Sequence, residues 1–228
     1  VPELDGLRGI AILAVMLSHF VTSLVTRNDS NLVVAWIWRT TGNGWMRVDL
    51  FFALSGFLIT SILLREKEAN GALLTFWQRR IMRIWPAYFF VVSVVILLAS
   101  FSAPLGLRGT EGITSHQIWL WLHLANVPIG LTDRNVFGGP HLVVNQLWSL
   151  SVEEHFYLAW PLIVFSASRR TLAFISLSTV AVVMIARVTA ALTGWDGNAI
   201  YALTPFRVDG FALASLAAVW NLGADQRS

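Results

Sequence analysis

The sequence contains no cysteine and few charged residues. Asp, Glu, Lys and Arg make up 13% of its 228 residues, whereas 56% are hydrophobic and the mean hydropathy is +0.64. A typical soluble domain is about a quarter charged and about half apolar. The absence of cysteine excludes a disulfide scaffold, thiol catalysis and thiolate metal sites. The shortage of charge excludes a disordered chain and most water-soluble enzymes, so the composition predicts a protein of the lipid bilayer.

Lysine is almost absent too. Of the 16 basic residues only Lys67 is lysine, and the rest are arginine. The isoelectric point near 9.9 resembles that of a nucleic-acid-binding protein. The net charge is only +3, however, and no basic run alternates with stacking aromatic residues in a polar context, so we expect no nucleic-acid partner. His116 and His123 have no third candidate ligand nearby, so we expect no metal site.

Long apolar runs predict the membrane crossings, since a crossing needs about 20 mostly apolar residues. The candidates are residues 9–26, 48–64, 84–107, 147–168, 171–195 and 200–224. A further stretch, residues 117–132, is short and rich in tryptophan, and it could be a span, a half-helix or an interfacial segment. The expected fold is therefore all-α, a polytopic transmembrane helical bundle with about six or seven spans.

Basic residues set the expected orientation, because cytoplasmic loops collect arginine and lysine. The densest basic group lies between the second and third runs, which places that loop and the N-terminus in the cytoplasm. Arg169 and Arg170 reach the same side only if residues 117–132 do not cross, which favours six spans. We expect one membrane domain over residues 1–228 without a second domain. Because the chain opens at Val1, we also expect it to be part of a longer protein.

Charged groups inside spans are costly and mark functional sites. Arg8 and His19 are 11 positions apart, which on an α-helix is about 1100°, within about 20° of three full turns. They therefore share a helix face about 16 Å apart, an arrangement that suits a long ligand with an anionic head and a reactive tail. Alternatively, Arg8 is a topology anchor and His19 a hydrogen-bonded packing residue.

Arg80 and Arg83 are three positions apart near the start of the third run and project from the same side of a helix. Two guanidinium groups placed there could hold a phosphate bidentately. The alternative is that they are topology anchors in contact with lipid phosphates.

The fourth run contains two adjacent carboxylates, Glu153 and Glu154, in an apolar context. Ser149, Glu153 and Tyr157 follow one another at a spacing of four and predict a polar stripe on one helix face. A carboxylate there could orient an imidazole, share a proton with it or neutralise an arginine.

Charged residues of the fourth and the last run also have structural interpretations. Glu154 could form an ion pair with Arg187 or Arg207. Arg207 and Asp209 follow Pro205, where a broken helix would free backbone groups, and we interpret this pair as structural rather than catalytic.

Ser55, followed by Gly56, resembles the serine of an intramembrane protease, although Ala53 stands where a glycine is usual. Small residues in spans more often serve close helix packing.

Five stretches together resemble one family, the integral-membrane acyltransferase-3 family. They are LDGLRGIAIL from Leu4, VDLFFALSGFLI from Val48, RRIMRIWP from Arg79, LWSLSVEEHFYL from Leu147 and FRVDGFAL from Phe206. Members include bacterial enzymes that O-acylate lipopolysaccharide O-antigen, peptidoglycan, exopolysaccharides and macrolides. The resemblance implies that an acyl group, usually acetyl from acetyl-CoA, is taken on the cytoplasmic side of the bacterial inner membrane. It is then passed to a sugar hydroxyl on the far side.

The family motifs map onto residues already singled out. The resemblance implies an arginine-to-histidine motif at Arg8 and His19, a paired-arginine motif at Arg80 and Arg83, and a serine-to-glutamate motif at Ser149 and Glu153. One departure is a histidine at position 155, where glutamine is common. A second is length: family domains have more spans than fit in this sequence, so we expect C-terminal ones to be missing here.

The residues and the resemblance together predict a membrane O-acyltransferase. Acyl-CoA is the expected donor substrate, no cofactor is expected to stay bound, and a carbohydrate or lipid-linked glycan is the expected acceptor. Arg8, Arg80 and Arg83 would hold the CoA phosphates, and His19 would act as general base or carry the acyl group. Glu153 would orient His19 or balance its charge, with contributions from Glu154 and Asp49. The alternatives are a transporter or flippase that relays protons or anions through the buried charges, and a serine protease built on Ser55.

Overall fold

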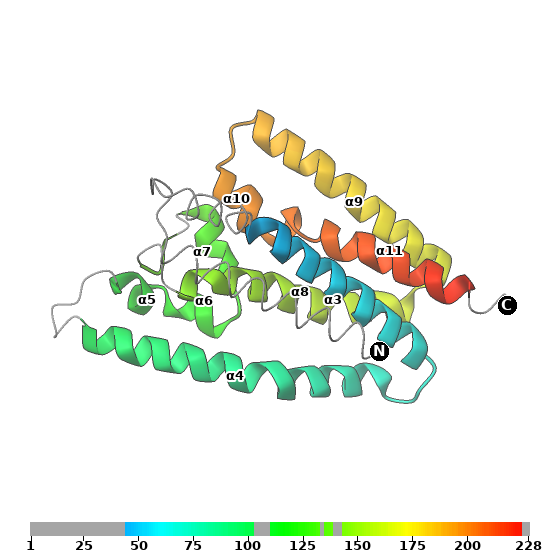
Figure 1. Ribbon diagram of the computed structural model, residues 1–228, viewed down its shortest axis with the longest axis horizontal. Coiled ribbons are helices and arrows are strands. Elements are labelled where there is room, and N and C mark those ends of the chain that lie inside the picture. The colour runs from blue at the N-terminus through cyan, green and yellow to red at the C-terminus, as the bar shows by residue number, and fades with distance from the viewer. Residues whose placement is uncertain (1–43, 103–109, 133–134, 139–142, 225–228) are drawn as a thin grey trace, which may run out of the picture.

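The computed structural model describes residues 44–102, 110–132, 135–138 and 143–224, and within these ranges it contains helices and turns but no strand (Figure 1). The helices are α3 Gly44–Glu66, α4 Ala72–Ser102, α5 Glu111–Ser115, α6 Gln117–Trp121, α7 Asn126–Leu131, η1 Val143–Gln146, α8 Leu147–Ser166, α9 Arg169–Leu192, α10 Gly197–Ala202, η2 Thr204–Phe206 and α11 Asp209–Ala224. The expected all-α class is confirmed for the described part of the chain.

Among the described residues, three helical segments are long and apolar enough to cross a membrane: Val48–Glu66, Ala72–Phe101 and Arg169–Leu192. The predicted runs 48–64 and 171–195 therefore become the helices α3 and α9. The first predicted run, residues 9–26, lies outside the described residues. The total of six or seven spans stays a prediction.

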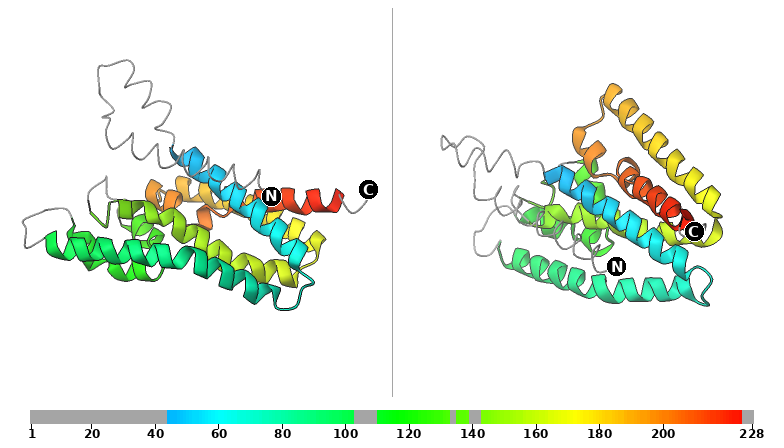
Figure 2. Two further views of the ribbon diagram at one scale, coloured as in Figure 1. Left: turned by 60° about the horizontal axis from the view of Figure 1, so that its bottom comes forward. Right: turned by 45° about the vertical axis from the view of Figure 1, so that its right-hand side comes forward.

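Helix α8 is the central helix of the bundle. It packs against α3, α4 and α7, and more than half of its residues are buried. Helices α4 and α9 lie on opposite sides of the molecule, with α3, α8 and α11 between them, as the right-hand view of Figure 2 shows. Stacked aromatic rings fill this central layer, with ring centroids 4.5 Å apart for Phe52 and Phe211 and 4.3 Å apart for Phe156 and Phe211. Polar side chains on α8 are consequently enclosed by protein.

Helix α4 begins earlier than the apolar run predicted. It starts at Ala72, directly after Gly71, whose φ of 71° belongs to the left-handed region that glycine adopts easily. Arg79, Arg80 and Arg83 therefore lie inside α4 and not in the loop before it. The expectation of a start near residue 84 is wrong because hydropathy falls at the arginines, whereas arginine is a good helix former.

Residues 117–132 do not form one helix across the bundle. They fold into α6 and α7, of five and six residues, separated by a turn. A helix of six residues is only about 9 Å long, so neither can cross a membrane. Of the three predicted possibilities, the full span is wrong here. The segment packs against α4, α8 and α10 (Figure 1), and we refer to residues 117–131 as the inserted segment.

The last apolar run is broken, as Pro205 predicted. It divides into α10, η2 and α11, and α11 then runs along α3 and α9. Gly56 permits the close approach of α3 and α11, because a Cβ atom at that position would lie 2.4 Å from the Phe211 carbonyl oxygen. The predicted close-packing role of small residues in the second run, residues 48–64, is confirmed for Gly56.

Candidate functional site

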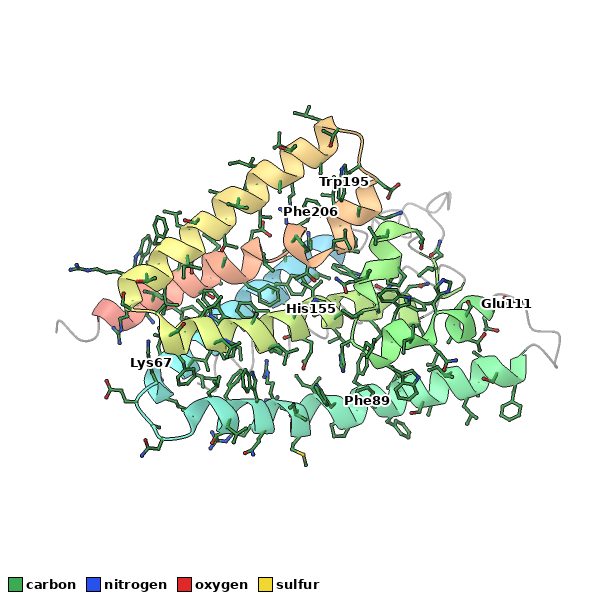
Figure 3. The ribbon with its side chains drawn as sticks, turned by 180° about the vertical axis from the view of Figure 1, so that it is seen from behind. Lys67, Phe89, Glu111, His155, Trp195 and Phe206 are labelled. Atoms are coloured by element: carbon green, nitrogen blue, oxygen red, sulfur yellow. The ribbon has the colours of Figure 1, made fainter. Side chains whose placement is uncertain are left out.

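Helix α8 directs three consecutive polar side chains, Glu153, Glu154 and His155, toward three different neighbours. Successive residues on an α-helix point about 100° apart, so adjacent side chains on a central helix must meet different elements. Glu153 meets α3, Glu154 meets α4, and His155 meets η2. The side chain of His155 lies within the bundle in Figure 3. Only 4% of Glu153 and 6% of Glu154 are exposed, so both carboxylates are buried.

Glu153 forms a compact cluster with two hydroxyl groups. Ser55 Oγ on α3 donates to Glu153 Oε1 at 2.9 Å, and the Tyr157 hydroxyl bonds the same oxygen from one turn further along α8. The Tyr157 hydroxyl also lies 3.3 Å from Ser55 Oγ. We call Ser55, Glu153 and Tyr157 the carboxylate node. Ser149, the first residue of the predicted stripe, instead donates to the Gln146 carbonyl at 3.2 Å.

Arg80 contacts the carboxylate node through Tyr157. The carbon at the centre of its guanidinium group lies 3.8 Å from the centre of the Tyr157 ring, a cation–π contact. Arg80 is half-buried, whereas Arg83, three positions further along α4, is exposed. The two arginines of the predicted phosphate site therefore differ in position. Arg80 reaches the interior of the bundle, and Arg83 remains at its surface.

Glu154 faces α4. Trp85 Nε1 donates to Glu154 Oε1 at 2.8 Å, and Arg80 is close enough to stabilise a negative charge on this carboxylate. The alternative that Glu154 pairs with Arg187 or Arg207 is wrong, because each of those arginines is paired with an aspartate.

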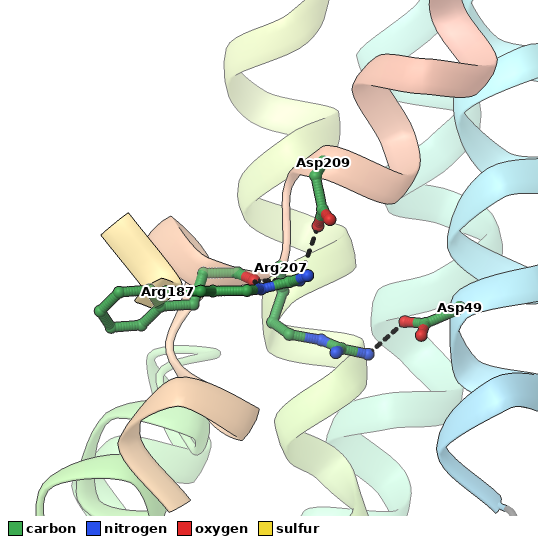
Figure 4. A network of polar contacts seen from close by, with 5 residues as sticks. Asp49, Arg187, Arg207 and Asp209 are labelled. Atoms are coloured by element: carbon green, nitrogen blue, oxygen red, sulfur yellow. Dashed lines mark hydrogen bonds and ion pairs between the residues drawn. The ribbon is translucent and has the colours of Figure 1, made fainter. Parts of the chain in front are cut away.

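The aspartates and arginines of α3, α9 and the η2–α11 region form a charged quartet, Asp49, Arg187, Arg207 and Asp209 (Figure 4). Arg187 bonds Asp209 at 2.8 Å, and its Nε donates at 2.7 Å to the carbonyl of Phe206, in the break between α10 and α11. Arg207 bonds Asp49. The structural interpretation of Arg207 and Asp209 fits this arrangement, although each has a partner on another helix.

Arg207 lies among aromatic rings and pairs with Asp49, so it does not belong to the carboxylate node. Only 7% of this residue is exposed, and its guanidinium lies 5.4–5.8 Å from the ring centres of Phe52, Trp148 and Tyr201. Its partner Asp49 is six positions before Ser55, about 9 Å along α3. Asp49 therefore belongs to the quartet and not to the node.

Sequence reasoning missed a second polar region beside Glu154. His155 Nδ1 lies 2.7 Å from Thr204 Oγ1, and Asn126 Nδ2 donates to the same hydroxyl at 3.0 Å. His123, in the turn of the inserted segment, is 6% exposed and stacks on Tyr88 with ring centroids 3.8 Å apart. The available signal for His123 is a histidine inside a short apolar stretch, although its spacing from His116 raises only the question of a metal site.

Arg8 and His19 lie outside the described residues. Their shared helix face, their separation and their position relative to the carboxylate node remain predictions.

Comparison with known proteins adds independent information. Residues 1–223 match the family described as an acyltransferase domain. The peptidoglycan O-acetyltransferase OatA of Listeria monocytogenes is 36% identical over 167 residues, which are 71% of this chain and 24% of the relative. The YrhL protein of Bacillus subtilis, named provisionally as a peptidoglycan O-acetyltransferase, is 35% identical over 71% of this chain and 23% of its own length.

The protein SACOL0978 of Staphylococcus aureus (strain COL), named provisionally as an O-acetyltransferase, is 35% identical over 72% of this chain and 24% of its own length. The chain thus spans about a quarter of the length of these curated relatives. No solved structure matches the chain. Because the family match extends over nearly the whole sequence, the chain belongs to the acyltransferase-3 family of acyltransferase domains.

Proposed function

We propose that this protein is a membrane O-acyltransferase that moves an acyl group, most simply acetyl, from acyl-CoA to a hydroxyl of a cell-surface glycan. The observation that carries the proposal is the buried carboxylate node with the Arg80 guanidinium packed on its tyrosine. Membership of the acyltransferase family supports the reaction class. Relatives named as peptidoglycan O-acetyltransferases support a glycan of the cell envelope as the acceptor.

In the proposed reaction, the acceptor hydroxyl gives its proton to His19 while its oxygen attacks the carbonyl carbon of the thioester. The new C–O bond forms, the C–S bond breaks, and the departing CoA thiolate takes up a proton. Glu153 orients the imidazole or balances its positive charge. In a second route, His19 first accepts the acyl group and then transfers it to the acceptor.

Arg8, Arg80 and Arg83 are the proposed ligands of the CoA phosphates. The contact between Arg80 and Tyr157 supports a link between the two halves of the site, because one residue could meet a phosphate and also touch the node that holds Glu153. The exposed position of Arg83 leaves its guanidinium accessible to a ligand at the surface of the bundle.

The proposed orientation places the α3–α4 turn in the cytoplasm of a bacterial inner membrane, together with the N-terminus. Arg65 lies in the last turn of α3, and Arg79 pairs with Glu66 at 3.6 Å across the α3–α4 turn. Lys67 donates to the carbonyls of Val164 and Ala167 at the C-terminal end of α8. The basic residues of this end agree with the positive-inside rule.

The test uses the full-length protein in liposomes, with labelled acetyl-CoA on one side and peptidoglycan glycan strands on the other. We expect acetyl transfer that requires both substrates and that His19→Ala abolishes. Glu68→Gln, at an exposed position, is the control for Glu153→Gln. Movement of a substrate without consumption of acetyl-CoA would contradict the proposal and favour a transporter. Full activity of His19→Ala would refute the role of this histidine.

A further inference from the structure

The inserted segment brings a histidine to the middle of the longest helix. His123 stacks on Tyr88, which lies about 24 Å from the start of α4 and about 21 Å from its end at 1.5 Å per residue. His123 itself is buried, as are Ala125 and Asn126 after it, whereas Leu122 in the same turn is exposed. Irregular backbone at such a place in a membrane protein is tolerated where protein encloses it or where it lines a cavity.

Aromatic rings hold the imidazole of His123 in place. Its ring is nearly parallel to the Tyr88 ring, at 22°, lies 5.8 Å from the Trp85 ring, and meets the edge of Phe89 at 5.3 Å. The backbone of His123 has a φ of 54°, which is uncommon for a residue other than glycine. The turn is fixed from α4, because the Tyr88 hydroxyl donates to the Leu120 carbonyl at 2.7 Å.

Polar atoms in this region lack partners. Both ring nitrogens of His123 and the side-chain oxygen of Asn126 are buried, and none of the three has a hydrogen bond within the described part of the chain. Buried polar atoms without a partner destabilise a fold, so such atoms point to a ligand, a bound water or a functional role. Strained backbone at the same residue supports a functional role.

The unpaired atoms define what could bind. The buried, aromatic surroundings of His123 favour a neutral imidazole, which offers one donor and one acceptor. Asn126 adds an acceptor. A hydroxyl group, which both donates and accepts, complements this set. An anion does not, because the Glu154 carboxylate bonds Trp85, whose ring faces His123.

The neighbouring surface suits a carbohydrate. Trp121, 38% exposed, stacks with Phe89 at 5.8 Å beside His123, so flat apolar rings adjoin the unpaired polar atoms. We propose that His123 and Asn126 bind a hydroxyl group of the carbohydrate acceptor. The proposal rests on the proposed O-acyltransferase function and adds to it the residues that receive the acceptor.

Helix α8 connects this acceptor site with the carboxylate node. Thr204 Oγ1 joins Asn126 Nδ2 to His155 Nδ1, so His155 is a positioning residue for Asn126. Glu154 accepts a hydrogen bond from Trp85 and so positions the Trp85 ring beside His123. Glu153, the residue before this pair, belongs to the node.

The experiment measures acceptor and donor separately, with the full-length protein in liposomes. Soluble glycan strands released from peptidoglycan are the acceptor probe and acetyl-CoA is the donor. Tryptophan fluorescence reports glycan binding without turnover, and initial rates give KM for each substrate. His123→Phe keeps an aromatic ring but removes both nitrogens. His116→Phe is the matched control, since this histidine of the preceding turn is only half-buried and bonds the Gly112 carbonyl at 3.2 Å.

We expect His123→Phe to weaken glycan binding and to raise KM for the glycan about tenfold, the effect of one lost hydrogen bond. KM for acetyl-CoA should stay within about twofold of the wild-type value, and His116→Phe should resemble the wild type. Inorganic phosphate should not displace the glycan strands. Wild-type glycan binding by His123→Phe, or displacement by phosphate, would overturn the proposal.

A variant that preserves the backbone separates binding from folding. His123→Asn keeps a residue that tolerates the left-handed region. Weak glycan binding with normal use of acetyl-CoA in this variant supports the acceptor site, and joint loss of both overturns it. If the wild type binds glycan through His123 but transfers no acetyl group, the proposed function fails and the glycan site stands. If the wild type transfers acetyl and His123→Phe binds glycan normally, only the acceptor site fails.

Discussion

The charged quartet and the carboxylate node both place ionisable groups inside a helical bundle, but they handle charge differently. In the quartet each carboxylate meets a guanidinium, so the negative charges of Asp49 and Asp209 are neutralised directly. In the node Glu153 accepts hydrogen bonds from two hydroxyl groups, and the nearby cation Arg80 contacts the tyrosine ring. Direct ion pairs fix the positions of helices. The proposed function gives the carboxylate of the node a different role, which is to orient a histidine or to exchange a proton with it.

The largest expected effect comes from removing the node's charge. Glu153→Gln should lower acetyl transfer about 1000-fold, which corresponds to about 4 kcal/mol in the activation barrier. The free energy of unfolding should change by no more than about 1 kcal/mol, because the amide oxygen can still accept from Ser55. Initial rates and thermal unfolding of the same preparation check both parts. Large destabilisation with proportionate loss of folded protein would make the node structural, like the quartet.

Breaking the quartet should lower the stability of the protein while leaving the activity of the folded fraction almost unchanged. Arg207→Met leaves Asp49 without its partner in a partly buried position, and we expect a loss of about 3 kcal/mol in stability. The double variant Asp49→Asn, Arg207→Met should recover part of the loss, because no unpaired charge remains. The activity of the fraction that stays folded should be close to normal. A stable but inactive Arg207→Met protein would show that the quartet takes part in the reaction.

Gly56→Ala probes the contact between α3 and α11 without altering charge. A Cβ atom would lie 2.4 Å from the backbone oxygen of Phe211, so the two helices must separate, at a cost of about 2 kcal/mol. Gly197→Ala is the control, because nothing lies within 4 Å of a Cβ built at that position. Thermal unfolding measures the difference. Equal stability of the two variants would mean that α11 can move away from α3 freely.

The smallest effect is expected from Tyr157→Phe. This change removes one hydrogen bond to Glu153 but keeps the ring on which Arg80 packs, so acetyl transfer should fall about tenfold while the affinity for acetyl-CoA stays unchanged. Ser166→Ala is the control on the same helix, because its hydroxyl donates to the carbonyls of Leu162 and Ile163 within α8 itself. A weaker affinity for acetyl-CoA in Tyr157→Phe would show that the hydroxyl group, and not the ring, supports the donor site.

The sequence predicted those features that depend on a single helix. The apolar runs located α3 and α9, Pro205 located the break before α11, and the spacing of Glu153 and Tyr157 placed them on one face of α8. These features follow from helical period and backbone chemistry alone. The start of α4 was misjudged because its first turns carry arginines that helices accept readily.

Contacts between residues on different helices could not be predicted from the helical period. Ser55 is 98 positions from Glu153, and Arg207 is 158 positions from Asp49. The period of one helix states which residues share a face but not which other helix covers that face. His123 was missed for the same reason, since its importance lies in contacts with α4 and in atoms that lack partners.

Because Glu153, Glu154 and His155 are consecutive on α8, the rotation of this helix about its own axis (its phase) sets the direction of all three side chains together. One inserted residue between Gln146 and Glu153 would turn all three side chains by about 100° at once, and each would then face its neighbour's partner. Substitutions can alter the three contacts one at a time, whereas insertions and deletions upstream cannot. A change of length in a loop elsewhere does not alter this phase, whereas the first two turns of α8 must keep a fixed length.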